Sequence, residues 1–319
     1  MPKQVVIQPT QDYKVVIKCF TYNQERFIED TLKGFVKQKA NFPFCALVVD
    51  DCSTDSTASI IRRYEEEYPE IIKGVYLQEN YYSQKKKKNP LLQPWFDRAE
   101  YIALCEGDDF WTDPSKLQRQ VDIMDADKNI GFVYSAFSVV NENNQELNLA
   151  WCEERMQRSH SGDLFASLMH HNYILTLTVC LRSDIYRKSV DYCQKSKVSI
   201  DYFQYLLFAG FSEGAYIPEK MGAYRINPNG IVQSDRKNGV RLCAISAVKA
   251  SEIFLKGDFK KRSFVEDKKI CASIIAKWRR LYKDGYVTKS EFKGLFLENP
   301  RLFFCIPLAA LQIAREKLC

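Results

Sequence analysis

Short apolar runs alternate with amphipathic stretches along the first 140 residues of the chain. Largely apolar runs predict strands at 14–20, 44–49, 101–105 and 131–140, and a weaker one at 72–78. Apolar residues at helical spacing predict helices at about 25–39, at 60–68 and at about 114–125. Because strands and helices follow each other through short connections, the pattern predicts a doubly wound, mostly parallel α/β sheet.

The alternation stops after residue 140. We expect a polar turn at 141–148, a short helix after residue 163, a strand at 176–181, an apolar helix at 198–209, and a small hairpin from 215–217 and 221–225. Residues 79–98 are expected to form a polar loop, and the residues after 238 are helical and basic. The sequence therefore predicts two halves of one domain, 1–140 and an α+β half at 141–238, followed by a helical C-terminal region at 239–319.

Composition narrows the class of protein. A chain of 319 residues with 46% hydrophobic and 27% charged residues is ordinary for a globular protein with a large core. The net charge of +6 is mild and no basic stripe with interleaved aromatic residues occurs, so we do not expect nucleic acid as a partner.

Cysteines, histidines and the N-terminal residues bear on the compartment. Eleven cysteines without a Cys-x-x-Cys pair are typical of reduced core thiols, and three histidines argue against a zinc site. The first residues lack the apolar core of a signal peptide. No apolar stretch approaches the roughly 18 residues needed to span a bilayer. These features predict a cytoplasmic protein.

Three carboxylates follow the fourth predicted strand, in the stretch Glu106-Gly107-Asp108-Asp109. Ligands of open α/β sheets bind at the carboxyl ends of the strands, where these side chains are expected. Carboxylates at this spacing supply hard oxygen ligands for Mg²⁺ or Mn²⁺ and leave room for substrate phosphates. The alternative is an acidic turn that only caps the following helix, with Asp113 as the capping residue.

A second acidic pair, Asp50-Asp51, follows the second predicted strand, and Ser53 comes shortly after it. An acid there can accept hydrogen bonds from ribose hydroxyls or a base N–H, although Asp50 and Ser53 can equally cap the next helix. The chain has neither G-x-x-x-x-G-K-[ST] nor G-x-G-x-x-G after the first strand, so a diphosphate would lack a glycine-rich loop. A cation held by Asp108 and Asp109 would then offset the charge of the diphosphate.

Three segments resemble, in order, the successive signatures of inverting family 2 glycosyltransferases: 15–23 (VVIKCFTYN), 48–55 (VVDDCSTD) and 106–109 (EGDD). Residues 105–122 are similar to bacterial members that build surface polysaccharides. The resemblance covers about the first 140 residues, weakens through residue 235 and is absent from the tail. It implies a GT-A fold, a nucleotide-diphosphate sugar donor such as a UDP-sugar, a glycan or lipid-linked acceptor, and Mn²⁺ or Mg²⁺ as cofactor.

The resemblance also implies roles for individual residues in the first half. Nucleotide contacts would lie at Phe20, Thr21, Tyr22, Asp50, Asp51, Ser53 and Asp108. Among these, Asp51 would bind the base. Asp109 would be the principal metal ligand, with Asp108 and Glu106 as further ligands.

In the second half, the resemblance implies a catalytic carboxylate at the start of a helix. Asp201 is the best match, with Asp184 and Asp191 as reserves. Displacement of a diphosphate with inversion needs an acceptor hydroxyl that attacks opposite the leaving group. A carboxylate that takes the hydroxyl proton accelerates such a step by about 10²–10⁴-fold.

Two departures from the family pattern leave alternatives open. Many members carry Asp where this chain has Glu106, and many carry His where this chain has Asn227, whose amide oxygen would have to replace a contact with the diphosphate or metal. A non-catalytic nucleotide-sugar-binding module is therefore one alternative. A sugar-1-phosphate nucleotidyltransferase is another, although residues 21–25 (TYNQE) do not form the glycine-rich basic loop of that class.

The tail adds two candidate partners. Its apolar segment 302–308 has basic neighbours, which is compatible with peripheral contact at the inner face of a membrane. The same segment can instead pack on the protein itself or on a second copy in a homo-oligomer.

Overall fold

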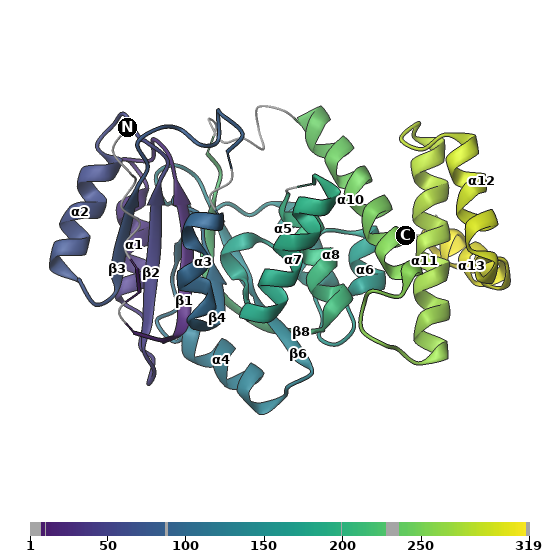
Figure 1. Cartoon of the computed structure of the whole chain (residues 1–319), viewed down its shortest axis with the longest axis horizontal. Coiled ribbons are helices and arrows are strands. Elements are labelled where there is room, and N and C mark those ends of the chain that lie inside the picture. The colour runs from purple at the N-terminus through teal and green to yellow at the C-terminus, as the bar shows by residue number, and fades with distance from the viewer. Residues whose placement is uncertain (1–7, 10, 87–88, 199, 228–235, 317–319) are drawn as a thin grey trace. The chain divides into compact units, whose positions relative to one another are not determined.

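The computed structural model describes residues 8–9, 11–86, 89–198, 200–227 and 236–316 (Figure 1). The chain divides into two compact units. The first comprises Met1–Ser159, Ile174–Arg187 and Ala215–Pro228, and the second comprises His160–Tyr173, Lys188–Gly214 and Asn229–Cys319. The predicted division of the chain into a nucleotide-sugar-binding half (1–140), an acceptor-binding half (141–238) and a C-terminal region (239–319) stays a prediction.

A mixed β-sheet organises the first unit. Strands β1 (Tyr13–Thr21), β2 (Phe44–Asp50), β3 (Ile72–Tyr76) and β4 (Ala99–Leu104) lie parallel in the order β3-β2-β1-β4. The sheet continues through β7 (Cys180–Arg182), β6 (Ile130–Val140), β8 (Glu213–Arg225) and β5 (Phe110–Trp111). In that part, β7 pairs antiparallel with β4 and β6, and β5 pairs antiparallel with β8. The predicted α/β architecture is confirmed, with the parallel arrangement in β3-β2-β1-β4.

Helices pack on this sheet through the apolar positions that their spacing predicts. The helices concerned are α1 (Ile28–Val36), α2 (Thr57–Glu67) and α4 (Lys116–Ala126). Ile28 and Leu32 of α1 are fully buried in one core cluster with Val15 of β1 and Val48 of β2. Burial of each such side chain stabilises the fold by about 1.5–3 kcal/mol. This core supports the carboxyl ends of β1 and β2.

Two predictions of local structure are wrong. Residues 79–98 contain the helix α3 (Asn89–Asp97). Leu92, Trp95 and Phe96 lie at helical spacing and are buried, and their packing outweighs the cost of Pro94 inside the helix. In place of the predicted hairpin the structure has the single strand β8. Residues 218–220 of this strand are exposed, and their composition is that of a turn.

Smaller differences affect other helices and strands. Residues 176–181 form a 3₁₀ helix, η1 (Thr176–Thr178), followed by β7. The helices α5 (Ala150–Arg158) and α7 (Ser183–Ser196) have no counterpart in the predicted pattern. Helix α1 is shorter than predicted.

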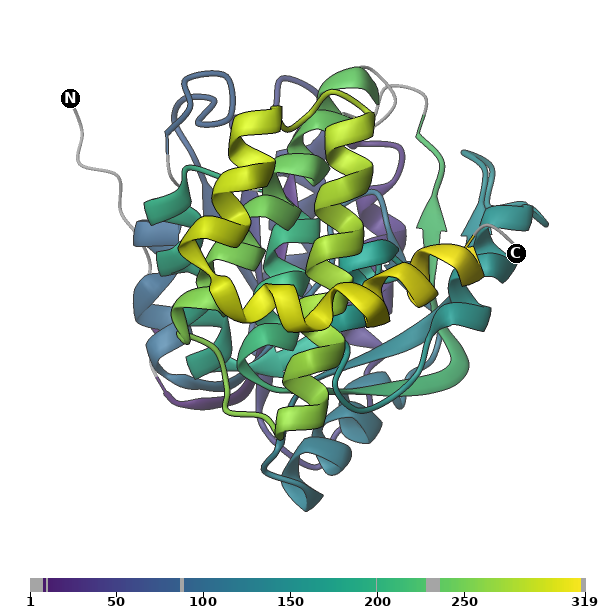
Figure 2. The ribbon, with the colours of Figure 1, turned by 90° about the vertical axis from the view of Figure 1, so that its right-hand side faces the viewer.

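The second unit is helical (Figure 2). It contains α6 (Phe165–His170), α8 (Asp201–Phe211), α10 (Arg236–Lys256), α11 (Phe264–Lys283), α12 (Lys289–Glu298), the 3₁₀ helix η2 (Pro300–Cys305) and α13 (Ile306–Glu316). Ser263 and Thr288 cap α11 and α12, each through a reciprocal bond with a glutamate three residues later. The predicted helical C-terminal region is confirmed.

Candidate active site

The turns that follow β1, β2 and β4 meet at one edge of the sheet. The strand register places Thr21, the last residue of β1, beside Asp50, the last residue of β2. The N–H of Gly107 donates to the carbonyl of Phe20 at 3.0 Å, and the N–H of Asp51 donates to the carbonyl of Thr21 at 3.0 Å. Residues from all three predicted motifs therefore come together, as expected for the carboxyl ends of neighbouring parallel strands.

Gly107 allows the turn after β4 to lie against the end of β1. A Cβ at this position would lie 2.4 Å from Gln24 Oε1 and 2.7 Å from Thr21 Oγ1. These two side chains hydrogen-bond each other at 2.7 Å, so a Cβ would disrupt their contact. The glycine between Glu106 and Asp108 is thus explained by close packing.

Asp109 is the most enclosed of the three predicted metal ligands, with 4% of its surface exposed. Its Oδ1 accepts the backbone N–H of Arg225 at 2.9 Å, and its carbonyl accepts Thr31 Oγ1 at 2.6 Å. Burial, followed by the neighbouring Asp108 carboxylate, raises the pKa of Asp109 well above its ordinary value, whereas the Arg225 N–H lowers it. A cation close to Asp109 would favour its ionised form.

Arg225 is a candidate functional residue that the sequence prediction missed. Its guanidinium, 1% exposed, pairs with Asp30 Oδ2 at 2.9 Å and donates from Nε to the Asp108 carbonyl at 2.8 Å. Its further partners are Asn144 Oδ1 and the rings of Phe27 and Phe110. Side chain and backbone of one arginine thus hold both Asp108 and Asp109. The sequence signal that could have identified Arg225 is a lone basic residue at the end of an apolar strand pattern.

Asn227 lies beside Asp108 in the first unit. Its Nδ2 donates to Asp108 Oδ2 at 3.3 Å. Burial raises the pKa of Asp108, and the hydrogen bond from Asn227 lowers it. The amide N–H of Asn227 faces the carboxylate here, and the predicted contact of its oxygen with a metal or diphosphate stays a prediction.

The two acids after β2 differ in what their carboxylates bind. Asp51 accepts the N–H groups of Tyr81 at 2.8 Å and Tyr82 at 3.1 Å, so it holds the segment after β3. Asp50 Oδ2 accepts the Ser53 N–H at 3.1 Å, but Asp50 Oδ1 is buried without a hydrogen-bond partner among the described residues. Burial raises the pKa of Asp50, and the Ser53 bonds lower it. A bound N–H or hydroxyl would remove the cost of this unsatisfied acceptor, about 1–3 kcal/mol.

Other acids make the contacts at the starts of the neighbouring helices. Asp55 Oδ1 accepts the N–H of Thr57 at 2.9 Å at the start of α2. Asp113 Oδ1 accepts the N–H of Ser115 at 2.7 Å just before α4. Asp113 thus makes the contact that the helix-cap alternative assigns to it, and the ligand-binding roles of Asp50, Asp108 and Asp109 stay predictions.

The remaining predicted residues have diverse surroundings. Tyr22 is 45% exposed, and Phe20 and Glu106 are half-buried. Asp201 belongs to the second unit, where it is exposed and is the first residue of α8. Its role as a catalytic carboxylate stays a prediction.

A divalent cation fits the chemistry of the Asp108–Asp109 turn. Both side chains carry hard oxygen donors, and the described part of the chain supplies a hydrogen bond to only one carboxylate oxygen of Asp109. Within that part, no three His, Cys, Asp or Glu side chains are grouped to hold a metal ion by themselves. Mg²⁺ is commonly held by one or two carboxylates together with substrate phosphates, so the turn suits an ion that binds with a diphosphate. The ligand roles of Asp109, Asp108 and Glu106 stay predictions.

The fold and the strand-end acids agree with a match to a known family of enzymes. Residues 16–190 match the model of glycosyl transferase family 2. The match covers more than half of the chain, and the chain belongs to this family. The resemblance inferred from the three motifs is confirmed.

Two relatives and one solved structure extend this finding. The uncharacterized protein Rv1520 of Mycobacterium tuberculosis is 34% identical over 222 residues, 68% of this chain and 60% of the relative. The putative teichuronic acid biosynthesis glycosyltransferase TuaG of Bacillus subtilis is 30% identical over 141 residues, 43% of this chain and 52% of TuaG. The matches therefore span between half and two thirds of these relatives. The structure of S. aureus TarS 1–349 with UDP-GlcNAc shares the fold, with a TM-score of 0.54 and 15% identity over 85% of this chain and 73% of that chain.

Proposed function

We propose that this chain transfers a sugar, with inversion, from a nucleotide diphosphate to a hydroxyl of a glycan or lipid-linked acceptor in surface-polysaccharide synthesis. The observation that carries the proposal is the Asp108–Asp109 turn on the same sheet edge as the unsatisfied oxygen of Asp50. Membership of glycosyl transferase family 2 and the likeness to TuaG support it. UDP-sugars are the first donors to test, because UDP-GlcNAc is the ligand in the TarS structure.

In this proposal the nucleoside binds between the ends of β1 and β2. Asp50 Oδ1 accepts a base N–H or a ribose hydroxyl, which supplies a partner that the described residues do not give to this buried oxygen. Thr21 and Tyr22 border the base. Asp51 acts mainly by holding the backbone after β3, because its carboxylate already accepts the Tyr81 N–H and a second N–H.

The diphosphate binds at the turn after β4. Asp109 and Asp108 would hold Mn²⁺ or Mg²⁺ there, and the ion would stabilise the negative charge that develops on the leaving diphosphate. Arg225 holds the Asp109 carboxylate through its backbone N–H and the backbone of Asp108 through its guanidinium. Asn227 limits the rotation of the Asp108 carboxylate.

The acceptor hydroxyl needs a group that takes its proton. We assign this step to Asp201, an exposed carboxylate at the first residue of α8. A positioned base of this kind is expected to contribute about 10²–10⁴-fold to turnover.

Transfer from labelled nucleotide sugars in Mn²⁺ tests the proposal. Asp109→Asn is expected to abolish transfer and to weaken Mn²⁺-dependent donor binding. Asp201→Asn is expected to keep donor binding and to lose about 10²–10⁴-fold in turnover. Asp122→Asn, at an exposed acid on α4, is the matched control and should retain both properties.

The outcomes separate the rival functions. Donor binding without transfer to any acceptor would favour a non-catalytic module. Release of pyrophosphate from a nucleoside triphosphate would favour a nucleotidyltransferase. Undiminished turnover in Asp201→Asn would remove the role assigned to that residue.

A further inference from the structure

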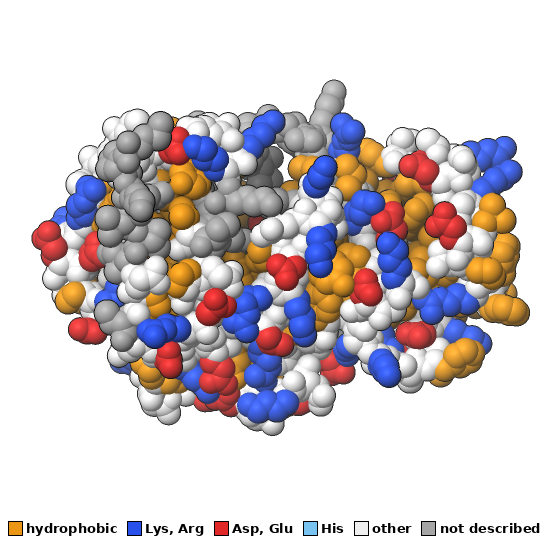
Figure 3. Space-filling view, in the orientation of Figure 1, with side chains coloured by type: hydrophobic (Ala, Val, Ile, Leu, Met, Phe, Trp, Pro, Cys, Tyr) orange, Lys and Arg blue, Asp and Glu red, His pale blue; other side chains and the backbone are white. Residues whose placement is uncertain are grey.

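The last segments of the second unit leave large apolar side chains uncovered. Their exposed fractions are 77% for Leu297, 52% for Phe303, 81% for Phe304, 40% for Leu308 and 63% for Leu311. We call these five side chains the C-terminal apolar face. Figure 2 shows the segments that carry it, α12, η2 and α13, on the near side of α11, and Figure 3 shows hydrophobic side chains gathered over α12 and α13.

The distribution of side chains on η2 and α13 is unusual for a surface that faces water. Residues 302–314 contain no charged side chain. Leu302, Cys305 and Ala309 are buried, whereas the other large apolar side chains at 303–311 are exposed, namely Phe303, Phe304, Ile306, Leu308 and Leu311. A surface helix in water normally turns polar residues outward, and a contiguous exposed apolar patch marks an interaction site.

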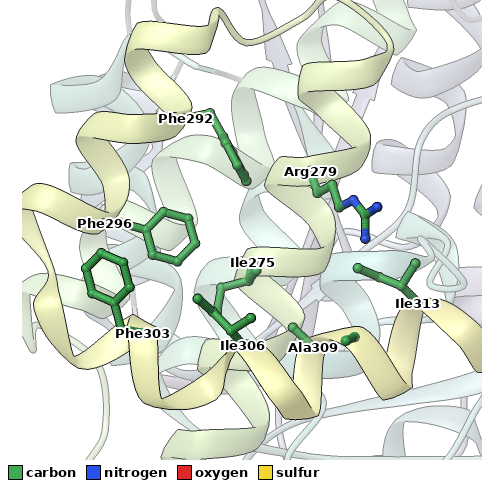
Figure 4. Close-up of a pocket in the computed structure, with 9 residues that line it drawn as sticks. Ile275, Arg279, Phe292, Phe296, Phe303, Ile306, Ala309 and Ile313 are labelled. Atoms are coloured by element: carbon green, nitrogen blue, oxygen red, sulfur yellow. The ribbon is translucent and has the colours of Figure 1, made fainter.

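An apolar cavity of about 340 Å³ adjoins this face (Figure 4). Its walls include Ile275 of α11, Phe292 and Phe296 of α12, and Ile306 of α13. Among the described residues that line it, Arg279 is the one that carries a charge. Apolar walls beside a guanidinium suit a hydrocarbon chain attached to an anionic head group.

The surroundings of the C-terminal apolar face are basic. Between Lys277 and Arg301, seven side chains are basic and three are acidic. Lys289 and Lys293 are exposed on α12 and stand one turn apart on the same side as Leu297. Pairing of this face with itself in a second copy would bring like charges together, whereas an anionic lipid surface complements them.

No single helix among the described residues has both the length and the apolar composition needed to cross a membrane. Helix α12 and residues 300–311 together have this length and apolar composition, but the chain bends by 100° between them. The exposed apolar residues come from both arms of this bend. Amphipathic helices with apolar residues on one side and cations beside them bind in the plane of the membrane interface.

We infer that the C-terminal apolar face docks this chain on an anionic lipid bilayer. Phe303, Phe304 and Leu311 enter the head-group boundary, while Lys289 and Lys293 contact anionic head groups. Two weak signals act together, because apolar insertion and basic attraction are each marginal alone. The inference does not rest on the proposed transfer reaction.

Co-sedimentation of the full chain with vesicles tests the inference. We expect binding to vesicles of phosphatidylglycerol and phosphatidylcholine, weaker binding to phosphatidylcholine alone, and a decrease with salt. The variant Phe304→Ser/Leu311→Ser should bind at least about tenfold more weakly, because both side chains lose their apolar insertion. Lys289→Gln/Lys293→Gln should weaken binding to the anionic vesicles by about tenfold and change binding to neutral vesicles little.

Two controls separate docking from other effects. Phe264→Ser changes a residue that is 73% exposed at the start of α11, outside the face, and should bind as the wild type does. Asp109→Asn should also bind vesicles normally, whatever it does to sugar transfer. Absence of vesicle binding, or equal binding to neutral and anionic vesicles, would overturn the inference. A dimer that Phe304→Ser dissociates, without vesicle binding by the wild type, would instead assign the face to self-association.

Discussion

Replacement of Arg225 by lysine tests whether the end of β8 holds the two acids of the candidate site. The guanidinium is 1% exposed and donates to Asp30, to the Asp108 carbonyl and to Asn144. A lysine keeps the charge, but its single ammonium cannot reproduce the planar fork that reaches these three acceptors. We expect the loss of about two hydrogen bonds, including one to a charged partner, which lowers the free energy of unfolding by about 2–4 kcal/mol. For a unit of this size, Tm falls by about 5–15 °C.

Calorimetric unfolding and donor titration in Mn²⁺ measure the two consequences. The substitution removes the hydrogen bond from Arg225 to the Asp108 carbonyl. We therefore expect the affinity for the nucleotide sugar in Mn²⁺ to fall by about tenfold, which corresponds to about 1.4 kcal/mol. Arg63→Lys is the matched control, since Arg63 pairs with Glu29 on the surface, where its side chain is 58% exposed. Such a pair is worth about 0–1 kcal/mol, so Tm should hardly change.

A double-mutant cycle with Asp30→Asn locates the effect. Arg225 and Asp30 are in direct contact, so their substitutions should not be additive, with a coupling energy of about 0.5–3 kcal/mol. If Arg225→Lys leaves both Tm and Mn²⁺-dependent donor binding at wild-type values, the guanidinium does not hold the turn and the reasoning is refuted.

Three further predictions concern the strand-end residues. Asp51→Asn should lower the free energy of unfolding by about 1–3 kcal/mol, because Asp51 accepts two backbone N–H groups. Asp50→Asn should mainly weaken binding of the nucleotide sugar. Equal effects of the two substitutions on Tm and on titration with the nucleotide sugar would contradict this division. In EDTA, Asp109→Asn should raise Tm relative to the wild type. Thermal melts from about pH 4 to 8 should show that this gain grows with pH. The reason is that an acid whose pKa is raised by folding lowers the stability of the folded state as pH rises from its unfolded pKa through its folded pKa. A gain that does not change with pH would count against buried ionisation. Gly107→Ala should weaken donor binding, measured by titration, because the new Cβ overlaps Thr21 and Gln24; unchanged affinity would show that the turn can relax.

The strand-end acids are predictable from sequence because of how buried parallel strands are encoded. Most residues of β1, β2 and β4 are buried, so each strand is a largely apolar run that stops at a polar turn. The acids that follow such runs must lie at one edge of the sheet. Carboxylates gathered at such an edge favour cations and nucleosides as ligands, so the class of ligand follows from residue type and strand order together.

The contacts around those acids are not predictable in the same way. Arg225 and Asp30 are 195 residues apart, and no local periodicity connects them. Asp50 and Asp51 differ in their roles because the N–H groups after β3 donate to Asp51. Two adjacent aspartates look alike in the sequence, and only the folded chain distinguishes them. The sequence prediction missed helix α3 because Pro94 suggests a break in a helix. In the folded chain, the burial of Trp95 offsets the cost of that proline.

The central claim is that Asp109 and its neighbours bind a divalent cation together with a nucleotide-diphosphate sugar. Calorimetric titration with a panel of UDP-, GDP- and dTDP-sugars, in Mn²⁺ and in EDTA, tests it most directly on the wild type and on Asp109→Asn. We predict that one donor binds the wild type in Mn²⁺, and that this binding is at least about tenfold weaker in EDTA or after the substitution. A donor that binds equally tightly in EDTA, or equally tightly to Asp109→Asn, would contradict the account.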